Sequence, residues 1–246
     1  MIVKKAMILA AGLGSRLGTL TQEQPKALVK VGAIPMIDRL LIQLREAGVE
    51  EVMINLHHHA DMIKNHVNNQ THNGIEIRFS HETDLLLDTG GALVAAKNFF
   101  RGDLPVLIHN VDILTNLDIS EMADYHLKHQ AQATLFVSGR SSQRALLFDK
   151  SFQLCGWTNL KTEEIKWVNN PSVNLSPLAY NGVWLAQPAF IHQIPFKGKF
   201  SIIDAWLHMA KNKPIIGYRN DQVSWHDLGT VEKISHAEDQ LNLKKP

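Results

Sequence analysis

The sequence contains a single cysteine, Cys155, among its 246 residues. A lone cysteine excludes an internal disulfide framework and fits a reducing compartment, so we expect a cytoplasmic protein. No stretch approaches the ~18 consecutive apolar residues of a membrane span, and the apolar start is too short for a signal peptide. The formal net charge is only +1. Because no overall charge favours nucleic acid or an anionic membrane, we expect neither as a partner.

The first half of the chain alternates short apolar runs with amphipathic segments. We expect strands over 5–11, 50–56, 75–82 and 104–112, and helices over 35–48, 60–69 and 89–100. This alternation predicts an α/β fold with a mostly parallel central sheet. Right-handed crossovers would place the carboxyl ends of the strands, with Gly12, Asn55 and Asp112, along one edge of that sheet.

The pattern changes after Asp112. We expect helices over 118–130, 201–213 and 231–243, and strands over 133–139, 144–149, 154–159, 163–168, 178–186 and 214–219. The close spacing of the middle strands predicts antiparallel hairpins. Because the sequence has no linker, repeat or low-complexity tract, we predict one domain over 1–246. Its nucleotide-binding half would cover 1–115, and its acceptor half, with the C-terminal helix, would cover 116–246.

A glycine-rich loop, "LAAGLGSRLG", follows the first expected strand at residues 9–18. Such a loop offers unpaired backbone N–H groups to phosphate oxygens. The ATP-binding G-x-x-x-x-G-K-[ST] pattern is absent from it. The dinucleotide pattern G-x-G-x-x-G fits poorly, because the third glycine, Gly18, comes one position late. That pattern also needs an acidic residue after the second strand, where this chain has Asn55 and histidines.

A longer stretch fits a third pattern. Residues 9–28, "LAAGLGSRLGTLTQEQPKAL", closely resemble the L-x-x-G-x-G-[ST]-R…P-K-x-L signature of the sugar-1-phosphate nucleotidylyltransferases, or nucleotide-sugar pyrophosphorylases. The resemblance implies a Rossmann-like three-layer αβα fold with a mixed central sheet and an antiparallel sugar-binding portion. It implies that the loop binds a nucleoside triphosphate, through residues Leu9, Ala10, Ala11, Gly12, Gly14, Ser15 and Arg16. Arg16 and Lys26 would neutralise phosphate charge during catalysis; alternatively, both are surface cations.

Two aspartates extend the resemblance. Asp112 ends the run "LPVLIHNVD", where the family usually has Gly-Asp, so Val111 is a departure. Asp227 lies in "SWHDLGT", which resembles the family's W-x-D-x-G-T segment. The resemblance makes both aspartates ligands of Mg²⁺, and Asp112 a catalytic residue. Each could instead cap a helix or form a turn.

Two further segments resemble substrate-binding parts of the family. "LLLDTGGALVAA" places Asp88, Thr89, Gly90 and Gly91 at an expected helix start. There Thr89 could cap the helix and the glycines allow close packing, while the resemblance assigns all four to the nucleotide pocket. This version of the segment is most similar to the N-acetylmuramate 1-phosphate uridylyltransferase and sugar-phosphate guanylyltransferase branches. The resemblance assigns sugar binding to residues Asn110, Asn181 and Gly182.

One family segment is missing. The Glu-Lys-Pro sequence that binds the sugar phosphate in larger members is replaced by "LCGWTNLKTEE". This leaves Arg140, Arg144 and Lys161 as candidate partners of a phosphate or carboxylate. The three histidines at 57–59 lack the spacing of a metal site, and the remaining histidines are expected at the surface.

The resemblance implies a cytoplasmic, Mg²⁺-dependent enzyme that makes a cell-wall or polysaccharide precursor. It would convert an NTP and a sugar 1-phosphate into an NDP-sugar and pyrophosphate, with UTP and an N-acetylmuramate-type sugar favoured. GTP or CTP with a mannose- or heptose-type sugar is the alternative, and a monomer or homodimer is expected. A dinucleotide-dependent oxidoreductase and a catalytically inactive nucleotide-binding regulatory relative stay open.

Overall fold

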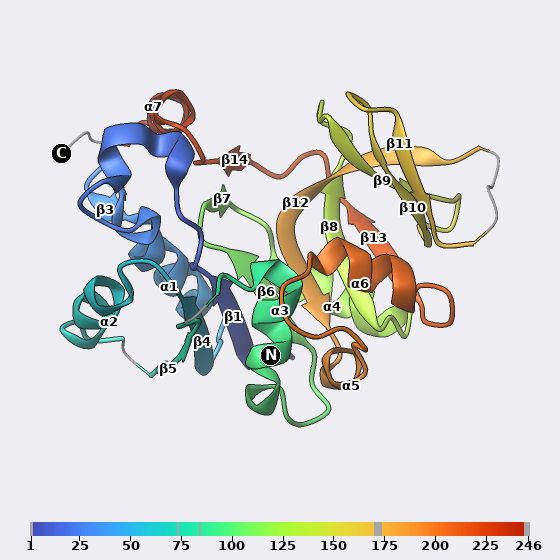
Figure 1. Ribbon diagram of the computed structural model, residues 1–246, viewed down its shortest axis with the longest axis horizontal. Helices are drawn as coiled ribbons and strands as arrows, with labels where there is room; N and C mark the ends of the chain where they lie inside the picture. The colour runs from blue at the N-terminus through green and yellow to red at the C-terminus, as the bar shows by residue number, and fades with distance from the viewer. Residues whose placement is uncertain (1, 73, 84, 170–173, 244–246) are drawn as a thin grey trace.

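Four parallel strands form one half of the central sheet (Figure 1). In the computed structural model, β1 (Lys5–Leu9) lies between β4 (Glu51–Leu56) and β6 (Val106–Asn110), and β5 (Glu76–His81) pairs with β4. The structure describes residues 2–72, 74–83, 85–169 and 174–243. The expected parallel arrangement of these strands is confirmed, and it brings their carboxyl ends to one edge.

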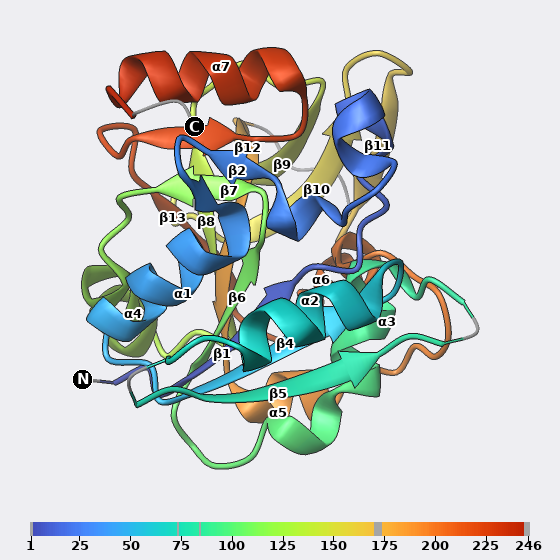
Figure 2. The same cartoon turned by 90° about the vertical axis from the view of Figure 1, so that its left-hand side faces the viewer.

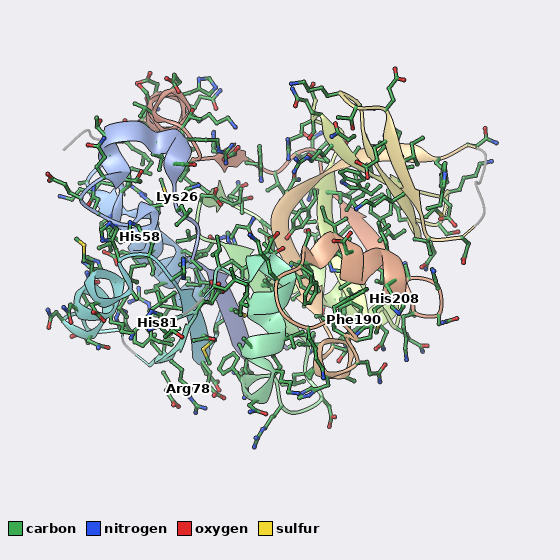
Figure 3. All side chains as sticks on the ribbon, in the orientation of Figure 1. Lys26, His58, Arg78, His81, Phe190 and His208 are labelled. Carbon is green, nitrogen blue, oxygen red and sulfur yellow. The ribbon has the colours of Figure 1, made fainter. Side chains whose placement is uncertain are left out.

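Helices cover both faces of the sheet, as the alternating burial of the strands requires. Ala6 and Ile8 of β1 face one core cluster, which also contains residues of α1, α2, α4 and α7, whereas Met7 faces a second cluster with α3, α5 and α6. Phe190, labelled in Figure 3, is buried in the second cluster. The bounds are α1 Met36–Glu46, α2 Ala60–Asn68, α3 Asp88–Ala95, α4 Ile119–Lys128, α5 Pro188–His192, α6 Ile202–Met209 and α7 Val231–Gln240. The three-layer αβα fold is therefore confirmed.

The second half of the chain extends the same sheet with mostly antiparallel strands. The strands are β8 (Ala133–Ser138), β9 (Arg144–Phe148), β10 (Leu154–Asn159), β11 (Glu164–Trp167), β12 (Ser176–Ala186) and β13 (Ile215–Arg219). The long β12 joins the halves, because it pairs antiparallel with β6 on one side and with β8 and β9 on the other. The predicted hairpins β9–β10 and β10–β11 are present. β13 adds on parallel to β8.

Several short elements have no counterpart among the sequence predictions. β7 (Ile113–Thr115) and β14 (Trp225–Asp227) form an antiparallel ribbon outside the main sheet. β2 (Lys30–Val31) pairs with β3 (Ile34–Pro35). Three short 3₁₀ helices are η1 Ser15–Thr21, η2 Lys26–Leu28 and η3 Lys97–Phe99. Figure 2 shows α7 lying over β14 and β2, and contacts between these elements agree with that view.

Three local expectations are wrong. The helix expected over 89–100 begins at Asp88 and ends at Ala95. Thr89 does not cap it, because the Thr89 hydroxyl oxygen instead accepts the Ile202 N–H at 3.0 Å, from a segment packed on α3. His109 and His126 are buried rather than at the surface, and burial lowers the pKa of each to about 4. In the described part of the chain, no helix is long and apolar enough to cross a membrane.

Candidate active site

A cavity of about 420 Å³ opens at the carboxyl edge of the parallel strands. Gly12, Asn55 and Asp112 all line it, as the crossover argument predicts. The complete lining is Leu9, Ala11, Gly12, Asn55, Glu82, Leu86, Asp88, Thr89, Asn110, Asp112 and Lys199. Another cavity, of about 560 Å³, lies between α1 and residues 114–120 and is lined by none of the predicted site residues. We place the candidate site at the 420 Å³ cavity because the glycine loop and several acidic residues meet there.

A buried hydrogen-bond network joins the two walls of this cavity. Asn55 accepts the Ala10 N–H from the glycine loop at 2.8 Å and donates to one Glu82 carboxylate oxygen at 2.7 Å. The other Glu82 oxygen accepts the Leu87 N–H, immediately before α3, also at 2.7 Å. Asn55 and Glu82 are 3% and 4% exposed. This network fixes the glycine loop relative to the start of α3, across the ends of three strands.

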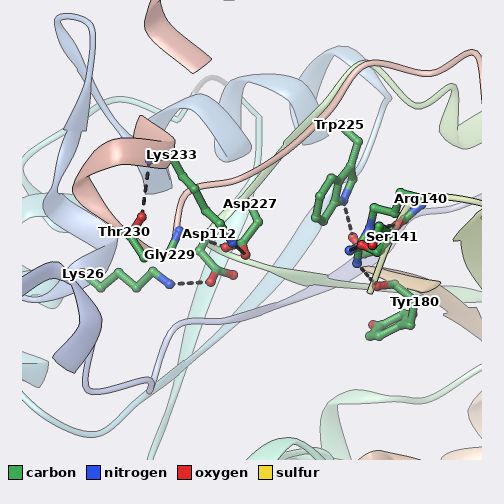
Figure 4. Close-up of polar contacts among 11 residues, drawn as sticks. Lys26, Asp112, Arg140, Ser141, Tyr180, Trp225, Asp227, Gly229, Thr230 and Lys233 are labelled. Carbon is green, nitrogen blue, oxygen red and sulfur yellow. Dashed lines mark hydrogen bonds and ion pairs between the residues drawn. The ribbon is translucent and has the colours of Figure 1, made fainter. Parts of the chain in front are cut away.

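Lys26 and Asp112 form an ion pair at the floor of the site (Figure 4). Lys26 is buried, on η2, and Asp112 lies in the turn between β6 and β7. The glycine loop approaches Lys26 closely at Gly14, whose φ is +66°. A Cβ on Gly14 would lie 2.9 Å from the Thr21 methyl carbon and 3.1 Å from the Lys26 Cβ. Glycine at position 14 therefore permits both the left-handed backbone and the contact that holds Lys26 in place.

The β7–β14 ribbon brings Asp227 beside Asp112. Asp227 pairs in register with Ile113, and the Leu228 N–H donates to the Asp112 carbonyl oxygen at 2.8 Å. Burial alone would raise the pKa of Asp227. The Lys233 ammonium, the Gly229 N–H and Lys26 outweigh that effect and hold the Asp227 pKa below its usual value.

Arg16 reaches the same place from the glycine loop. A Cβ on Gly229 would stand 2.9 Å from an Arg16 terminal guanidinium nitrogen and 2.7 Å from an Asp227 carboxylate oxygen. The Arg16 guanidinium thus packs against the bare backbone of the segment that carries Asp227. Two cations predicted from the sequence, Arg16 and Lys26, thus lie beside two predicted acids, Asp227 and Asp112, that come much later in the chain.

The two aspartates have the donor chemistry that Mg²⁺ prefers, since each offers hard carboxylate oxygens. Their side chains keep 19% and 21% of their surface exposed, for Asp112 and Asp227 respectively. Within the described ranges, no group of three or more histidine, cysteine or acidic side chains is arranged to hold a metal. Two carboxylates completed by substrate phosphates and water are a usual Mg²⁺ arrangement, so the residues present fit this ion.

Not every predicted residue lines the 420 Å³ cavity. Gly90 and Gly91 face the segment 198–200, where a Cβ would lie 2.2 Å from the Phe200 ring and 2.3 Å from the Gly198 oxygen respectively. Their role in the structure is close packing of α3. The lining also does not include Ala10, Gly14, Ser15 and Arg16. Gly182, with φ of +79°, contacts the site indirectly, since its Cβ would lie 3.1 Å from the Asn110 amide nitrogen.

Asn181 belongs to a neighbouring cavity of about 400 Å³, together with Arg140 and Trp225. Arg144 and Lys161, the other candidate anion partners, are exposed and line neither cavity. Sequence reasoning missed Glu82 and Lys199 as lining residues. Nothing in "SHETD" distinguishes Glu82 from a surface acid. Lys199 reaches the cavity only because residues 198–202 dock on α3.

Comparison with known proteins decides the family. The family model described as "Nucleotidyl transferase" matches residues 5–146, which include the glycine loop, Lys26 and Asp112. The chain belongs to the nucleotidyl transferase family. Within this family, it is 28% identical over 254 residues to N-acetylmuramate alpha-1-phosphate uridylyltransferase of Caulobacter vibrioides, covering 97% of both chains.

Other relatives of this nucleotidyl transferase are longer. It is 28% identical over 200 residues to a probable mannose-1-phosphate guanylyltransferase 1 of Oryza sativa subsp. japonica, covering 78% of this chain but only 52% of the relative.

Among solved structures, UTP-bound UGPase from Acinetobacter baumannii superposes with a TM-score of 0.81 at 19% identity, covering 99% of this chain and 95% of that one. HddC from Yersinia pseudotuberculosis complexed with GMP-PN gives 0.76 at 20% identity, covering 97% and 100%. These likenesses show a shared fold.

Proposed function

We propose that this nucleotidyl transferase moves a nucleotidyl group from an NTP to a sugar 1-phosphate, releasing pyrophosphate and an NDP-sugar. The observation that carries the proposal is the meeting of Arg16, Lys26, Asp112 and Asp227 beside the glycine loop. Two cations and two carboxylates in one place match a reaction between a triphosphate and a phosphate monoester, which together carry about six negative charges. The sugar-phosphate relatives described above support the same acceptor class.

The residues define how the reaction would proceed. The glycine loop binds the triphosphate through backbone N–H groups. The acceptor phosphate oxygen attacks the α-phosphorus, and pyrophosphate leaves from the opposite side. Arg16 and Lys26 neutralise the charge on the α-phosphoryl group and the leaving pyrophosphate. The attacking oxygen is already anionic, so no protein base and no covalent intermediate are required; alignment and charge neutralisation supply the rate.

Asp112 and Asp227 are the proposed ligands of Mg²⁺. When bound there, the ion would supply positive charge that offsets the repulsion between the two substrates' phosphates. In the structure each carboxylate is paired with a lysine, Asp112 with Lys26 and Asp227 with Lys233. Both carboxylates stay partly exposed, so their oxygens are accessible to a hard cation.

We propose UTP and an N-acetylmuramate-type sugar phosphate as the substrates. The support is the relative that matches this chain over nearly its full length. Guanylyl transfer to mannose 1-phosphate is the second candidate, because mannose-1-phosphate guanyltransferases match about half of this chain.

Pyrophosphate release from the four common NTPs and a panel of sugar 1-phosphates tests the proposal. We expect one NTP and one sugar class to give turnover that stops when EDTA removes divalent cations and returns with Mg²⁺. Asp112→Asn and Asp227→Asn should each lower kcat at least ~100-fold, with unchanged circular dichroism. Asp124→Asn, on the surface of α4, is the matched control and should keep full turnover. Normal turnover in both site variants would refute the metal assignment.

A further inference from the structure

Arg140 is held in an unusually well-defined position at the edge of the second cavity. It follows β8, and its Nε–H donates to the Asn181 side-chain oxygen at 2.9 Å, while Nη2 donates to the Tyr180 carbonyl oxygen at 2.8 Å. Its guanidinium stacks over the Trp225 ring at 4.0 Å from the centroid. The Trp225 indole N–H in turn donates to the Asn181 carbonyl oxygen at 2.8 Å. A long flexible side chain is thereby fixed in one plane and one orientation (Figure 4).

This fixed guanidinium has no carboxylate partner among the residues that the structure describes. Its Nε–Nη2 edge is occupied by Asn181 and Tyr180. The Nη1–Nη2 edge makes only a 3.5 Å contact, from Nη1 to the Ser141 carbonyl oxygen. Apart from this long hydrogen bond, the two N–H groups on that edge have no partner among the described residues, and this fork matches the two oxygens of a carboxylate. The nearby Arg219 is different, because Asp221 already pairs with it.

Asn181 provides a second unused donor. Its side-chain oxygen accepts from both Arg140 and the Ser138 hydroxyl, and since Arg Nε can only donate, the amide orientation is fixed. The amide nitrogen is then left buried with no partner among the described residues, on a side chain that is 0% exposed. An unpartnered buried donor is costly, so its place in the wall of the 400 Å³ cavity indicates a ligand that accepts hydrogen bonds.

The position of this pair relative to the reaction site is set by β14. Trp225 and Asp227 are two residues apart on one strand, so they project from the same face about 7 Å apart along the chain. Burial lowers the pKa of Arg140, and the charge of Asp227 opposes that effect, so the two groups interact. The Arg140 guanidinium and the Asn181 amide therefore lie close to Asp112 and Asp227, the carboxylates that the transferred phosphate would approach.

We propose that Arg140, positioned by Asn181 and Trp225, recognises a carboxylate on the acceptor sugar phosphate. This inference rests on the proposed function and names the acceptor class: a sugar 1-phosphate with an acidic substituent. The acceptor's own phosphate is the weaker candidate, because it must lie at Asp112 and Asp227 beside Arg16 and Lys26. Figure 4 shows Trp225 standing between those carboxylates and Arg140.

The test compares two acceptors of equal shape. These are N-acetylmuramic acid 1-phosphate and its carboxamide, in which the carboxylate is replaced by a neutral amide. We expect the wild-type protein to use the acid with a KM about 10- to 100-fold lower than that of the carboxamide, the usual effect of hydrogen bonds to a charged group. Arg140→Gln should abolish this preference by raising the KM for the acid, with the KM for the NTP unchanged.

Two further variants separate recognition from folding. Arg140→Lys keeps the charge but not the fork or the stacking, so it should keep a small part of the preference and should fold if Arg140→Gln does not. Arg144→Gln removes an exposed arginine of the same segment and should keep the full preference. An Arg140 variant that raises the KM of both acceptors equally would overturn the proposal, since a structural or phosphate-binding role predicts that result.

Binding of both acceptors without NTP, measured by calorimetry, keeps the inference separate from the proposed function. If no sugar phosphate is turned over but the acid binds more tightly than the carboxamide, and Arg140→Gln removes the difference, the proposed reaction fails while carboxylate recognition stands. If turnover is normal but the wild-type protein does not distinguish the acceptors, carboxylate recognition fails while the reaction stands.

Discussion

The network that joins the glycine loop to α3 leads to a sharp prediction, because each of its hydrogen bonds runs in a fixed direction. The Ala10 N–H donates to Asn55, the Asn55 amide donates to Glu82, and the Leu87 N–H donates to the other Glu82 oxygen. Glu82→Gln keeps the shape but replaces one acceptor with an NH₂ group. This NH₂ group then faces another donor, either the Asn55 amide or the Leu87 N–H. If Asn55 flips to relieve one conflict, the conflict moves to Ala10.

The expected loss of stability follows from the hydrogen bonds that Glu82→Gln removes. A hydrogen bond to a charged group contributes about 1.5–3 kcal/mol, and a buried donor left without an acceptor adds its own penalty. Because both side chains are almost fully buried, we expect Glu82→Gln to lower the free energy of unfolding by about 3 kcal/mol. Asn55→Asp should have a similar cost at neutral pH, because it places two carboxylates against each other.

The double variant Asn55→Asp/Glu82→Gln provides the decisive comparison. The introduced aspartate would accept from both the Ala10 N–H and the amide of the introduced glutamine, and the side-chain oxygen of that glutamine would accept the Leu87 N–H. Every donor again has an acceptor, so the double variant should be more stable than either single variant and recover most of the loss. A non-additive rescue of this kind is the expected signature of directly coupled residues.

Urea unfolding at neutral pH, followed by circular dichroism, measures all four proteins, and equal m-values establish that their free energies are comparable. The KM for the NTP gives a second readout, since the network spaces the two walls of the 420 Å³ cavity, where we propose that the nucleotide binds. A double variant less stable than both single variants would refute the assigned bond directions.

Two other predictions concern Gly229 and His126. Gly229→Ala places a methyl group within 3 Å of Arg16 and Asp227. Steady-state kinetics should therefore show kcat/KM lowered by about 100-fold, while thermal melting should show little change in the melting temperature. Unchanged kinetics would show that Arg16 is free to move away. Burial lowers the pKa of His126 from 6.5 to about 4, so between these pH values the unfolded chain binds a proton at His126 that the folded chain does not. Stability should therefore fall as the pH drops from 6.5 towards 4, with His126 contributing about 3 kcal/mol across that window. In urea titrations at several pH values, His126→Gln should remove about half of the slope that the two buried histidines create, whereas His129→Gln, an exposed change at the C-cap of the same helix, should leave it intact.

Long elements were predictable because their signals are local. α1 shows an apolar residue at every helical turn and ends before Gly48, and four of the six residues of β4 are apolar, so both lie within two residues of their predicted bounds. β14 has only three residues, too few for any periodic pattern. It is a strand only because β7, more than a hundred residues earlier in the chain, provides its partner.

The residues of the candidate site differ in the same way, since some were predictable from the sequence and others depend on distant partners. The family signature named Arg16, Lys26, Asp112 and Asp227, and the structure brings these four residues together. Their neighbours were less predictable. Glu82 becomes a buried network member only through the pairing of β4 with β5, and a local rule for Thr89 failed because a distant backbone N–H took its hydroxyl oxygen. Asn181 was predicted to bind sugar, and its unused amide nitrogen lies next to Arg140 in a separate cavity.

The β7–β14 ribbon also makes the site a composite of two distant stretches of the chain. The glycine loop, Lys26 and Asp112 all lie in the first half of the chain, whereas Asp227 reaches them through the pairing of β14 with β7. A change that weakens this three-residue pairing would therefore displace the second acidic residue while leaving the glycine loop, Lys26 and Asp112 in place. Binding of a nucleotide and its transfer could in this way be lost separately.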